Sequence, residues 1–384
     1  MPRATRRSAT PDADAPSTAV AVRSPAAKRA KRGADGGEKV DEVIGGGAIA
    51  LRKTKTARGA PSRTSSLPAP IMKLTGHRAS VHSVSFSHGG DVLASAGGDK
   101  VIELWRATSD ASTSDAASSS SFGDNYAELR GAKNAITRVT FTRDDENVVS
   151  ADADGVIRVF DAAVGTQVKS YVGARGKCAN DVACGAGDVI ASASDDGRVM
   201  LWDLRVAKRA SRAFACDVPT TAVAMSKDGG RVFSGGVDDV VRMWDARMDA
   251  EAVLTMRGHS DTITGLAISP CGAYVLSNAM DNTLKMWDTR AYVEGEREMK
   301  SFVGHAHNYE KGLLRCAFSS DGTRVAAGSA DMCVYVWDVD KGKLAYKLPG
   351  HKGAVNDVAF HPVENPILAS AGADGVIFLG ELDR

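Results

Sequence analysis

Residues 257–288 read RGHSDTITGLAISPCGAYVLSNAMDNTLKMWD, beginning near a Gly-His pair and ending with Trp-Asp. Apolar and polar side chains alternate between residues 283 and 287. This period of two is typical of a β-strand, and the Pro-Cys-Gly sequence at residues 270–272 favours a tight turn. We therefore expect short strands joined by tight turns, with Leu284 and Met286 on the strand face opposite Trp287.

The same unit recurs seven times from Ile71 onward. The tryptophan position is occupied by Trp105, Phe160, Trp202, Trp244, Trp287, Trp337 and Gly380, with steps of 55, 42, 42, 43, 50 and 43 residues. Six residues before each position stands an aspartate: Asp99, Asp154, Asp196, Asp238, Asp281, Asp331 and Asp374. A period of about 40–45 residues is typical of four-stranded propeller blades. The repeat predicts an all-β, seven-bladed β-propeller over residues 70–384.

Two further positions complete the repeated unit. Four residues before the aspartate stands Ser95, Ser150, Ser192, Ser234, Ser277 or Ser370, with Ala327 as the exception. Gly-His pairs occur at His77, His259, His305 and His351, whereas Gly-Ala occurs at Ala132 and Ala174 and the fourth unit has no such pair.

A His, Ser and Asp set suggests a hydrolase triad, but a catalytic set is assembled once and this one recurs. We interpret it as a buried network in which the aspartate accepts from the histidine and the serine contacts both the histidine and the indole N–H. Such a network satisfies groups that would cost ~1–3 kcal/mol each if left unpaired. The expected members are His77, Ser95, Asp99, Trp105, Asp154, Asp196, Trp202, Asp238, Trp244, His259, Ser277, Asp281, Trp287, His305, Asp331, Trp337, His351, Ser370 and Asp374.

The final unit ends soon after Leu379, one strand short of a blade. The segment ahead of the first Gly-His supplies a spare strand, so we expect residues 71–75 to close the last blade. Pairing the two ends would remove the last exposed sheet edges.

Residues 1–69 form a separate segment of low hydrophobic periodicity, which we expect to be a disordered tail. This tail carries 14 Lys and Arg against 6 Asp and Glu, a net charge of +8, whereas the remaining residues carry 34 against 41, a net charge of −7. Its cluster Lys28, Arg29, Lys31 and Arg32 is a candidate nuclear import signal, with a solvated basic patch as the alternative. The serine-rich insertion 109–123 is also expected to be disordered.

The sequence contains no phosphate-binding Gly-Lys loop, no His-Glu-x-x-His and no Cys-x-x-Cys pair, so we expect no metal, no cofactor and no enzymatic activity. The six scattered cysteines predict reduced thiols, and no apolar run is long enough to span a membrane. We expect the four histidines outside the repeated set to lie at the surface or in loops: His82, His88, His307 and His361.

The units from Gly-His to Trp-Asp resemble the WD-repeat family over residues 71–384. Residues 65–72, 276–282, 307–316 and 346–351 and the ending without tryptophan at 379–381 resemble, more closely, the family of 40-kDa WD-repeat subunits of the U5 small nuclear ribonucleoprotein. This resemblance implies a nuclear, non-catalytic component of the spliceosome, within the U5 and U4/U6·U5 particles. It also implies one copy docked on the large U5 core protein, with U5 RNA contacted only indirectly.

Two other functions stay open at this stage. Trp-Asp-x-Arg boxes at residues 202–205, 244–247 and 287–290 resemble those of substrate receptors for cullin-type ubiquitin ligases. A histone-binding chromatin protein is the third alternative.

One loop is a candidate for the docking surface. His305 lies 32 residues before its tryptophan, whereas His77 and His259 lie 28 residues before theirs. Loops on a rigid scaffold often carry recognition. We therefore expect the extra residues to take part in docking: His307, Asn308, Tyr309, Glu310 and Lys311.

Overall fold

The computed structural model describes residues 67, 69, 71–106, 123–173, 176–206, 210–248, 251–308, 310, 312–363 and 367–382. The import candidate at 28–32, the rest of residues 1–66 and nearly all of the serine-rich insertion lie outside these residues. Ala174, Tyr309 and Lys311 also lie outside them.

The described residues form seven antiparallel sheets of four strands each. Blade 1 contains β2 (Val81–Phe86), β3 (Val92–Gly97), β4 (Val101–Arg106) and β5 (Asn125–Arg130). Blade 2 contains β6 (Ile136–Phe141), β7 (Asn147–Asp152), β8 (Val156–Asp161) and β9 (Gln167–Val172). Blade 3 contains β10 (Ala179–Cys184), β11 (Val189–Ser194), β12 (Arg198–Asp203) and β13 (Arg212–Ala215). Blade 4 contains β14 (Thr220–Met225), β15 (Arg231–Gly236), β16 (Val240–Asp245) and β17 (Leu254–Arg257).

The remaining three blades follow the same order. Blade 5 contains β18 (Ile263–Ile268), β19 (Tyr274–Ala279), β20 (Thr283–Asp288) and β21 (Glu298–Val303). Blade 6 contains β22 (Cys316–Phe318), β23 (Arg324–Gly328), β24 (Cys333–Asp338) and β25 (Lys343–Pro349). Blade 7 contains β26 (Val355–Phe360), β27 (Ile367–Gly372) and β28 (Val376–Glu381), and its fourth strand is β1 (Ile71–Thr75).

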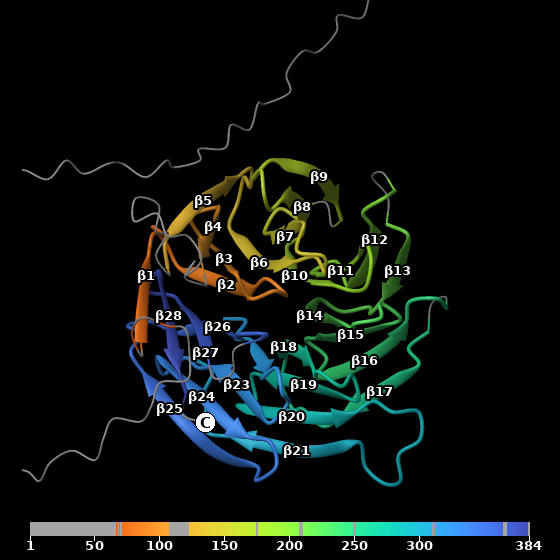
Figure 1. Cartoon of the computed structure of the whole chain (residues 1–384). Coiled ribbons are helices and arrows are strands. Elements are labelled where there is room, and N and C mark those ends of the chain that lie inside the picture. Colours follow the sequence, from red (N-terminus) through yellow and green to blue (C-terminus); the bar gives the residue numbers. More distant parts are fainter. Residues whose placement is uncertain are drawn as a thin grey trace, which may run out of the picture. The chain divides into compact units, whose positions relative to one another are not determined.

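The first strand of each blade faces the axis of a ring, and β26 of the last blade lies beside β2 of the first (Figure 1). We call the face where these inner strands begin the top face and the face where they end the bottom face. Because the strands alternate in direction, the Gly-His loops and the aspartate turns all lie on the top face. The predicted all-β, seven-bladed propeller is confirmed.

Strand β1 completes blade 7 by pairing with β28. The register runs from Ile71 opposite Gly380 to Thr75 opposite Val376. Leu74 is 4% exposed, and Leu67, just upstream, is 2% exposed in the same apolar cluster. Two segments from opposite ends of the described chain therefore share one sheet.

The apolar core lies between neighbouring blades. Trp287 packs in a cluster with Phe233 and Val241 of blade 4, whereas Leu284 and Met286 pack in another cluster with residues of blade 6. The predicted alternation of these side chains along β20 is confirmed. Each sheet is buried on both faces, which holds the blades at fixed positions around the axis. The described residues contain no helix long and apolar enough to cross a membrane.

Candidate protein-docking surfaces

Blades 1 and 5 contain the full repeated network. In blade 1, Trp105 Nε1 donates to Ser95 Oγ at 2.8 Å, and His77 lies 2.7 Å from Ser95 Oγ and 2.8 Å from Asp99 Oδ2. Because Ser95 accepts from the indole, its own proton points to His77 Nε2, and His77 Nδ1 donates to Asp99.

In blade 5 the corresponding distances are 2.8 Å from Trp287 Nε1 to Ser277 Oγ, 2.6 Å from His259 Nε2 to Ser277 Oγ and 2.9 Å from His259 Nδ1 to Asp281 Oδ2. The side chains of His77 and His259 are 1% and 0% exposed, so a substrate in solvent cannot reach either ring.

Three blades contain part of the network. In blade 7, His351 bonds Ser370 at 2.9 Å and Asp374 at 3.2 Å, and the ring of Phe378 packs edge-on against His351. In blades 3 and 4 the histidine is missing, and only the bonds from the two tryptophans to serine are present, Trp202 to Ser192 and Trp244 to Ser234. The turn aspartates of these two blades have other partners: Asp196 accepts from Ser194, and Asp238 pairs with Arg242.

In blade 6 the expected network is wrong. Because Ala327 replaces the serine, Trp337 Nε1 donates instead to the carbonyl oxygen of Val303 at 3.1 Å. His305 Nε2 lies 2.7 Å from Asn278 Oδ1 of the preceding blade, with no bond to Asp331. Asp331 accepts from Tyr335 Oη at 2.6 Å and from Lys347 Nζ at 2.9 Å.

The expected role of Asp154 in blade 2 is also wrong. This blade has neither a histidine nor a tryptophan at the repeated positions, so Asp154 accepts only from Asn134 Nδ2 at 3.2 Å. Ser150 Oγ is buried without a hydrogen-bond partner among the described residues. The full hydrogen-bond network therefore forms only in a blade whose sequence supplies the histidine, the serine and the tryptophan together.

The complete networks lower the pKa of their aspartates. Burial alone would raise the pKa of Asp281, but hydrogen bonds from His259, Thr283 and the Ser260 amide outweigh it and hold that pKa well below its usual value. Asp99 and Asp374 show the same balance, and their pKa values are also lowered. These carboxylates are ionised and satisfied within their own blades.

A second repeated feature escaped the sequence analysis. The second residue of an inner strand uses its side chain to bond a main-chain carbonyl oxygen of the next blade, which ties neighbouring blades together. Six such bonds are present in the described ring: His82 to Ile136, Thr137 to Ala179, Asn180 to Thr220, Thr221 to Ile263, Thr264 to Leu314 and Asn356 to Val81. Leu314 occupies this position in blade 6 and cannot donate.

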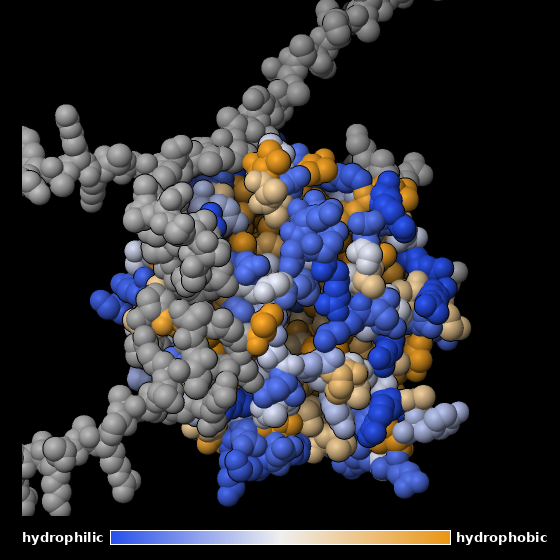
Figure 2. Space-filling view, viewed as in Figure 1, coloured by the Kyte–Doolittle hydropathy of each residue, from blue (hydrophilic) through white to orange (hydrophobic). Residues whose placement is uncertain are grey.

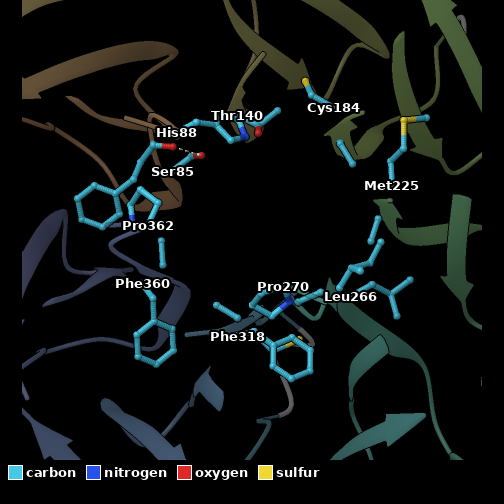
Figure 3. Close-up of a pocket in the computed structure, with 18 of the residues that line it drawn as sticks. Ser85, His88, Thr140, Cys184, Met225, Leu266, Pro270, Phe318, Phe360 and Pro362 are labelled. Carbon is cyan, nitrogen blue, oxygen red and sulfur yellow. Dashed lines mark hydrogen bonds between the residues drawn. The ribbon is translucent and has the colours of Figure 1, made fainter. Parts of the chain in front are cut away.

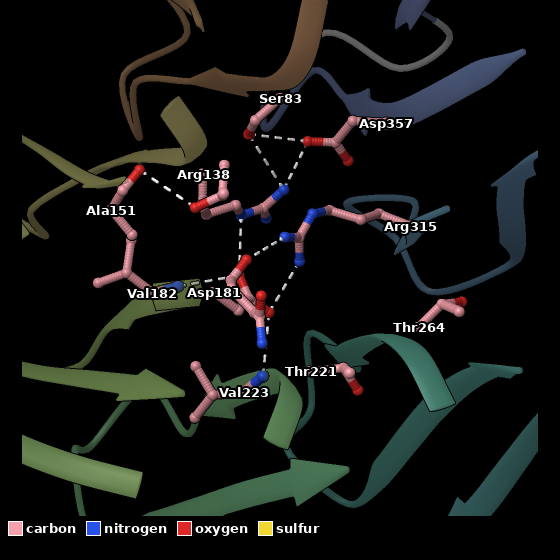
Figure 4. Close-up of polar contacts among 12 residues, drawn as sticks. Ser83, Arg138, Ala151, Asp181, Val182, Thr221, Val223, Thr264, Arg315 and Asp357 are labelled. Carbon is pink, nitrogen blue, oxygen red and sulfur yellow. Dashed lines mark hydrogen bonds and ion pairs between the residues drawn. The ribbon is translucent and has the colours of Figure 1, made fainter. Parts of the chain in front are cut away.

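The third residue of the inner strand faces the central channel in blades 2, 3 and 7, and Arg315 takes the equivalent position just before β22 in blade 6. These four charged side chains form one cluster (Figure 4). Arg315 Nη1 lies 2.8 Å from Asp181 Oδ2, and Arg138 lies 3.4 Å from Asp181 and 2.5 Å from Asp357. Ser83 Oγ donates to Asp357 at 3.0 Å. Both aspartates are at most 2% exposed, and the cluster is electrically neutral. It joins blades 1, 2, 3, 6 and 7 across the axis.

The sequence does carry a signal for this cluster. Arg138, Asp181 and Asp357 stand where the equivalent residues of blades 4 and 5 are small, Ala222 and Gly265. A Cβ on Gly265 would lie 2.9 Å from the Cα of Arg315, so this glycine allows the Arg315 backbone to approach. Charges within otherwise apolar strands could have indicated a polar layer in the channel.

Below this layer, the channel widens into a pocket that opens on the bottom face (Figure 3). The fifth residue of each six-residue inner strand lines it, Ala317 takes the equivalent position in the shorter β22, and all seven side chains are small: Ser85, Thr140, Ala183, Ala224, Ala267, Ala317 and Ala359. Apolar side chains that include Met225, Phe318 and Phe360 surround the pocket closer to the mouth. We refer to this pocket as the bottom-face well.

On the top face, the candidate docking loop is described only in part. The His307 amide donates to Asn282 Oδ1 at 2.6 Å, and Asn308 Nδ2 donates to Glu310 Oε2 at 3.2 Å. Burial lowers the pKa of His305 and of His307 to about 4, and the neighbouring His307 ring adds to the effect on His305. Both imidazoles are therefore neutral at pH 7, and the loop starts at the buried ring of His305 and the half-buried ring of His307.

One expectation about the other histidines needs correction, because His82 lies within strand β2, whereas His361 lies in the loop after β26 as expected. His361 is buried at 2% exposure, where its Nε2 lies 3.0 Å from the Gly90 carbonyl oxygen and its ring packs against Phe86. His82 is a member of the inter-blade bonds described above. His88 is exposed and pairs with Asp145.

No group of three or more His, Cys, Asp or Glu among the described residues is placed to hold a metal ion. All six cysteines are free thiols, and burial raises the pKa of Cys184 and of Cys316 to about 12. The face shown in Figure 2 is mainly hydrophilic, with apolar side chains in scattered patches.

These features define a ring whose repeated polar sets are internal and whose loops are displayed on two faces. The chain matches the model of the WD domain, G-beta repeat, seven times, over residues 68–106, 123–161, 165–203, 214–245, 250–288, 296–338 and 342–379. The chain therefore belongs to the WD-repeat family.

Within this family, the chain is similar to splicing proteins over more than four-fifths of its length. The human "U5 small nuclear ribonucleoprotein 40 kDa protein" is 41% identical over 323 residues, which cover 84% of this chain and 86% of the human protein. The Dictyostelium discoideum protein of the same name is 40% identical over 325 residues, covering 83% and 86%. The pre-mRNA-splicing factor cwf17 of Schizosaccharomyces pombe is 40% identical over 324 residues, covering 84% and 90%. The resemblance noted in the sequence is confirmed.

Proposed function

We propose that the chain is a non-catalytic protein-docking scaffold in pre-mRNA splicing, a component of the U5 particle and of the U4/U6·U5 tri-particle in the nucleus. The observation that carries this proposal is similarity at 40–41% identity to U5 40 kDa proteins and to cwf17 over more than four-fifths of the chain. Its direct partner in this proposal is the large U5 core protein, and it contacts U5 RNA only through proteins.

The geometry of the repeated networks supports a structural role for them. In blades 1 and 5 the serine hydroxyl is engaged by both an indole N–H and a histidine, and the histidines are fully enclosed. A nucleophile needs a free lone pair directed at a space that a substrate can occupy. The His, Ser and Asp sets therefore stabilise individual blades, and we assign recognition of partners to the loops.

We propose further that the loop over residues 307–311 is part of the docking surface. Its described part follows His305 on the top face and holds an internal bond between Asn308 and Glu310. Because the buried His305 and the bond from the His307 amide to Asn282 fix the start of the loop, Asn308 and Glu310 are presented at a defined position on the ring. Preorganised loops lose little entropy on binding.

The test is recovery of U5 RNA and the large U5 protein with a tagged full-length chain. In the double variant Tyr309→Ala/Lys311→Ala, we expect recovery to fall at least fivefold while the melting temperature stays within 2 °C of the wild type. The matched control is Tyr292→Ala/Lys341→Ala, which removes an exposed aromatic residue and an exposed cation from bottom-face turns. Wild-type recovery by the loop variant would exclude the loop, and failure of the wild-type chain to retrieve U5 RNA would refute the splicing function.

The same purification separates the two other functions. A ubiquitin-ligase adaptor in place of U5 RNA would favour the receptor function of the Trp-Asp-x-Arg boxes, where Arg205 and Arg290 are exposed and pair with the aspartates of their own boxes. Nucleosomes in place of both would favour a chromatin protein.

Nuclear localisation is proposed to depend on the basic cluster of the tail. Alanine at Lys28, Arg29, Lys31 and Arg32 should shift a fluorescent fusion of the full chain to the cytoplasm. A fusion that stays nuclear would assign import to another segment or to a partner.

A further inference from the structure

The bottom-face well differs from the rest of the propeller in its charge. None of the described residues that line it carries a carboxylate, although residues 70–384 have a net charge of −7. Its lining includes the cations Arg138, Arg143 and Lys227 and the imidazole of His88. The lining of the well therefore carries cations and no carboxylate, although Asp144 and Asp228 lie beside the cations in the turns at its rim.

Only two of these groups are available to a ligand. Arg138 is neutralised by Asp181 and Asp357 at the floor of the well, and His88 pairs with Asp145 at 3.0 Å. Arg143 is half-buried and Lys227 is exposed, and neither forms an ion pair or a side-chain hydrogen bond with a described residue. Arg143 is the second residue after β6 in blade 2, and Lys227 is the second residue after β14 in blade 4. Both residues therefore lie at the mouth of the well on the bottom face.

The walls of the well suit an apolar side chain. The neutral charge cluster lies at the inner end of the well. Between this cluster and the mouth on the bottom face, the seven small residues at the fifth strand position leave open space. Ala224, Ala267, Ala317 and Ala359 form more than half of that layer, and Leu266, Phe318 and Phe360 add apolar surface around it. An apolar group that enters this space would leave water at a gain of ~25 cal/mol per Å² of buried surface.

We propose that the bottom-face well binds a short acidic segment of a partner protein, with one apolar side chain inserted in the well and flanking carboxylates on Arg143 and Lys227. This proposal deepens the docking function proposed above and rests on it. It places a second docking site on the face opposite the loop at residues 307–311. The basic N-terminal tail, with a net charge of +8, does not complement this site.

A nucleic acid fits the mouth less well. The turns that supply the two cations also carry Asp144 and Asp228, and the equivalent turn of blade 6 carries Asp321; each aspartate is held in place by a hydroxyl group of its own turn. These hydrogen bonds lower the pKa of Asp228, and they outweigh burial to lower that of Asp321. A continuous phosphate backbone would meet this ring of carboxylates, whereas a peptide with one or two acids can place them on the cations alone.

The proposal is tested in the particle with a photo-crosslinking residue. The full-length tagged chain carries p-benzoylphenylalanine in place of Ser320, which lines the well, or in place of Lys133 on the top face. Irradiation of the purified U5 particle and mass spectrometry should identify one peptide that crosslinks from Ser320 and not from Lys133. We expect it to contain an apolar residue with Asp or Glu within two positions.

Charge reversal then tests the two cations. Arg143→Glu/Lys227→Glu should lower the crosslink yield at least fivefold and weaken binding of the identified peptide, labelled with fluorescein, at least tenfold. The matched control Lys133→Glu/Lys352→Glu makes the same change of net charge on the top face and should bind the peptide within twofold of the wild type. Melting temperatures show that both variants fold.

Three results would overturn the proposal. They are a crosslink to RNA, a crosslink to a basic or wholly polar peptide, and no crosslink at Ser320 in a chain that still retrieves U5 RNA. Equal loss of peptide binding in the control variant would also overturn it, because the effect would then follow net charge and not the well. A chain that retrieves no U5 RNA would instead refute the splicing function, so the two failures are distinguishable.

Discussion

Arg315 of blade 6 and Asp181 of blade 3 form an ion pair across the central channel, with 2.8 Å between Nη1 and Oδ2. Both side chains are at least 95% buried, and Asp181 also accepts the main-chain N–H of Val223 in blade 4 at 2.9 Å. Contacts of this kind connect blades that are not neighbours in the ring. These contacts couple the stability of blades that do not adjoin one another in the ring.

Removal of Arg315 is expected to destabilise the whole ring. The variant Arg315→Met keeps most of the apolar stem but leaves Asp181 buried with only the more distant Arg138, so the free energy of unfolding should fall by ~3–5 kcal/mol. Urea denaturation measures the loss. Lys341→Met breaks an exposed pair with Asp338 and serves as the control, with no measurable change expected. A loss below ~1 kcal/mol for Arg315→Met would show that water replaces the missing cation.

The blade networks predict a contrast between two aspartates at equivalent positions. Asp281→Ala leaves His259, Thr283 and a main-chain N–H without their acceptor and should cost ~2–4 kcal/mol. Asp238→Ala in blade 4 removes only a partly exposed pair with Arg242 and should cost less than ~1 kcal/mol. Thermal and urea unfolding of the two variants measure the two losses in the free energy of unfolding. Equal losses would mean that the histidine adds nothing to the network.

Buried histidines predict a loss of stability in mild acid. The pKa of both His305 and His307 is lowered to about 4 in the folded chain, against an unfolded value of about 6.5. Below pH 6.5 the unfolded chain therefore binds protons that the folded chain does not. The free energy of unfolding should fall between pH 6.5 and pH 4, by on the order of 3 kcal/mol for each histidine, and this contribution is constant below pH 4.

Substitution isolates this effect. In His305→Gln/His307→Gln the decline between pH 6.5 and pH 4 should be visibly shallower, with the remainder due in part to His351, whose pKa burial also lowers. The aspartates of the networks contribute at lower pH, because their lowered pKa values remove stability only as pH falls below about 3.8. An unchanged decline in the double variant would contradict the prediction.

Truncation tests closure of the ring. Deletion of residues 1–65 should leave the melting temperature within about 2 °C of the wild type, because the described segment Leu67–Thr75 is kept. Deletion through Leu74 removes β1 and two buried leucines, and each leucine alone contributes ~1.5–3 kcal/mol of burial. We expect this second chain to melt at least 10 °C lower or to aggregate. Similar melting of both truncated chains would show that β28 does not need its partner.

The architecture was predictable because each blade repeats the same local signals. Spacing alone places Ser95, Asp99 and Trp105 in one sheet, and their bonds form as expected wherever all partners of the set are present. The network of His305 was not predictable from spacing. Its partner Asn278 belongs to the neighbouring blade, and it is available because it stands where other units have glycine or alanine before the aspartate.

The channel cluster shows a second limit of the same kind. Arg138, Asp181 and Asp357 are visible in the sequence as charges within strands, but their pairing depends on how seven strands are arranged around an axis. The same holds for His361, whose burial results from its contact with the Gly90 turn of blade 1. Local sequence patterns predict which residues each strand carries. Contacts between residues of different blades depend on how the seven blades are arranged around the axis.

The pairing of β1 with β28 has a consequence for synthesis of the protein on the ribosome. Thr75 and Val376 are neighbours in the sheet but about 300 residues apart in the chain, which corresponds to roughly 15–60 s of translation at ordinary elongation rates. Throughout that time the first strand has no partner, and the growing row of blades has an open edge at each end. Nascent chains therefore keep unpaired strand edges, which can pair wrongly, until the last blade emerges.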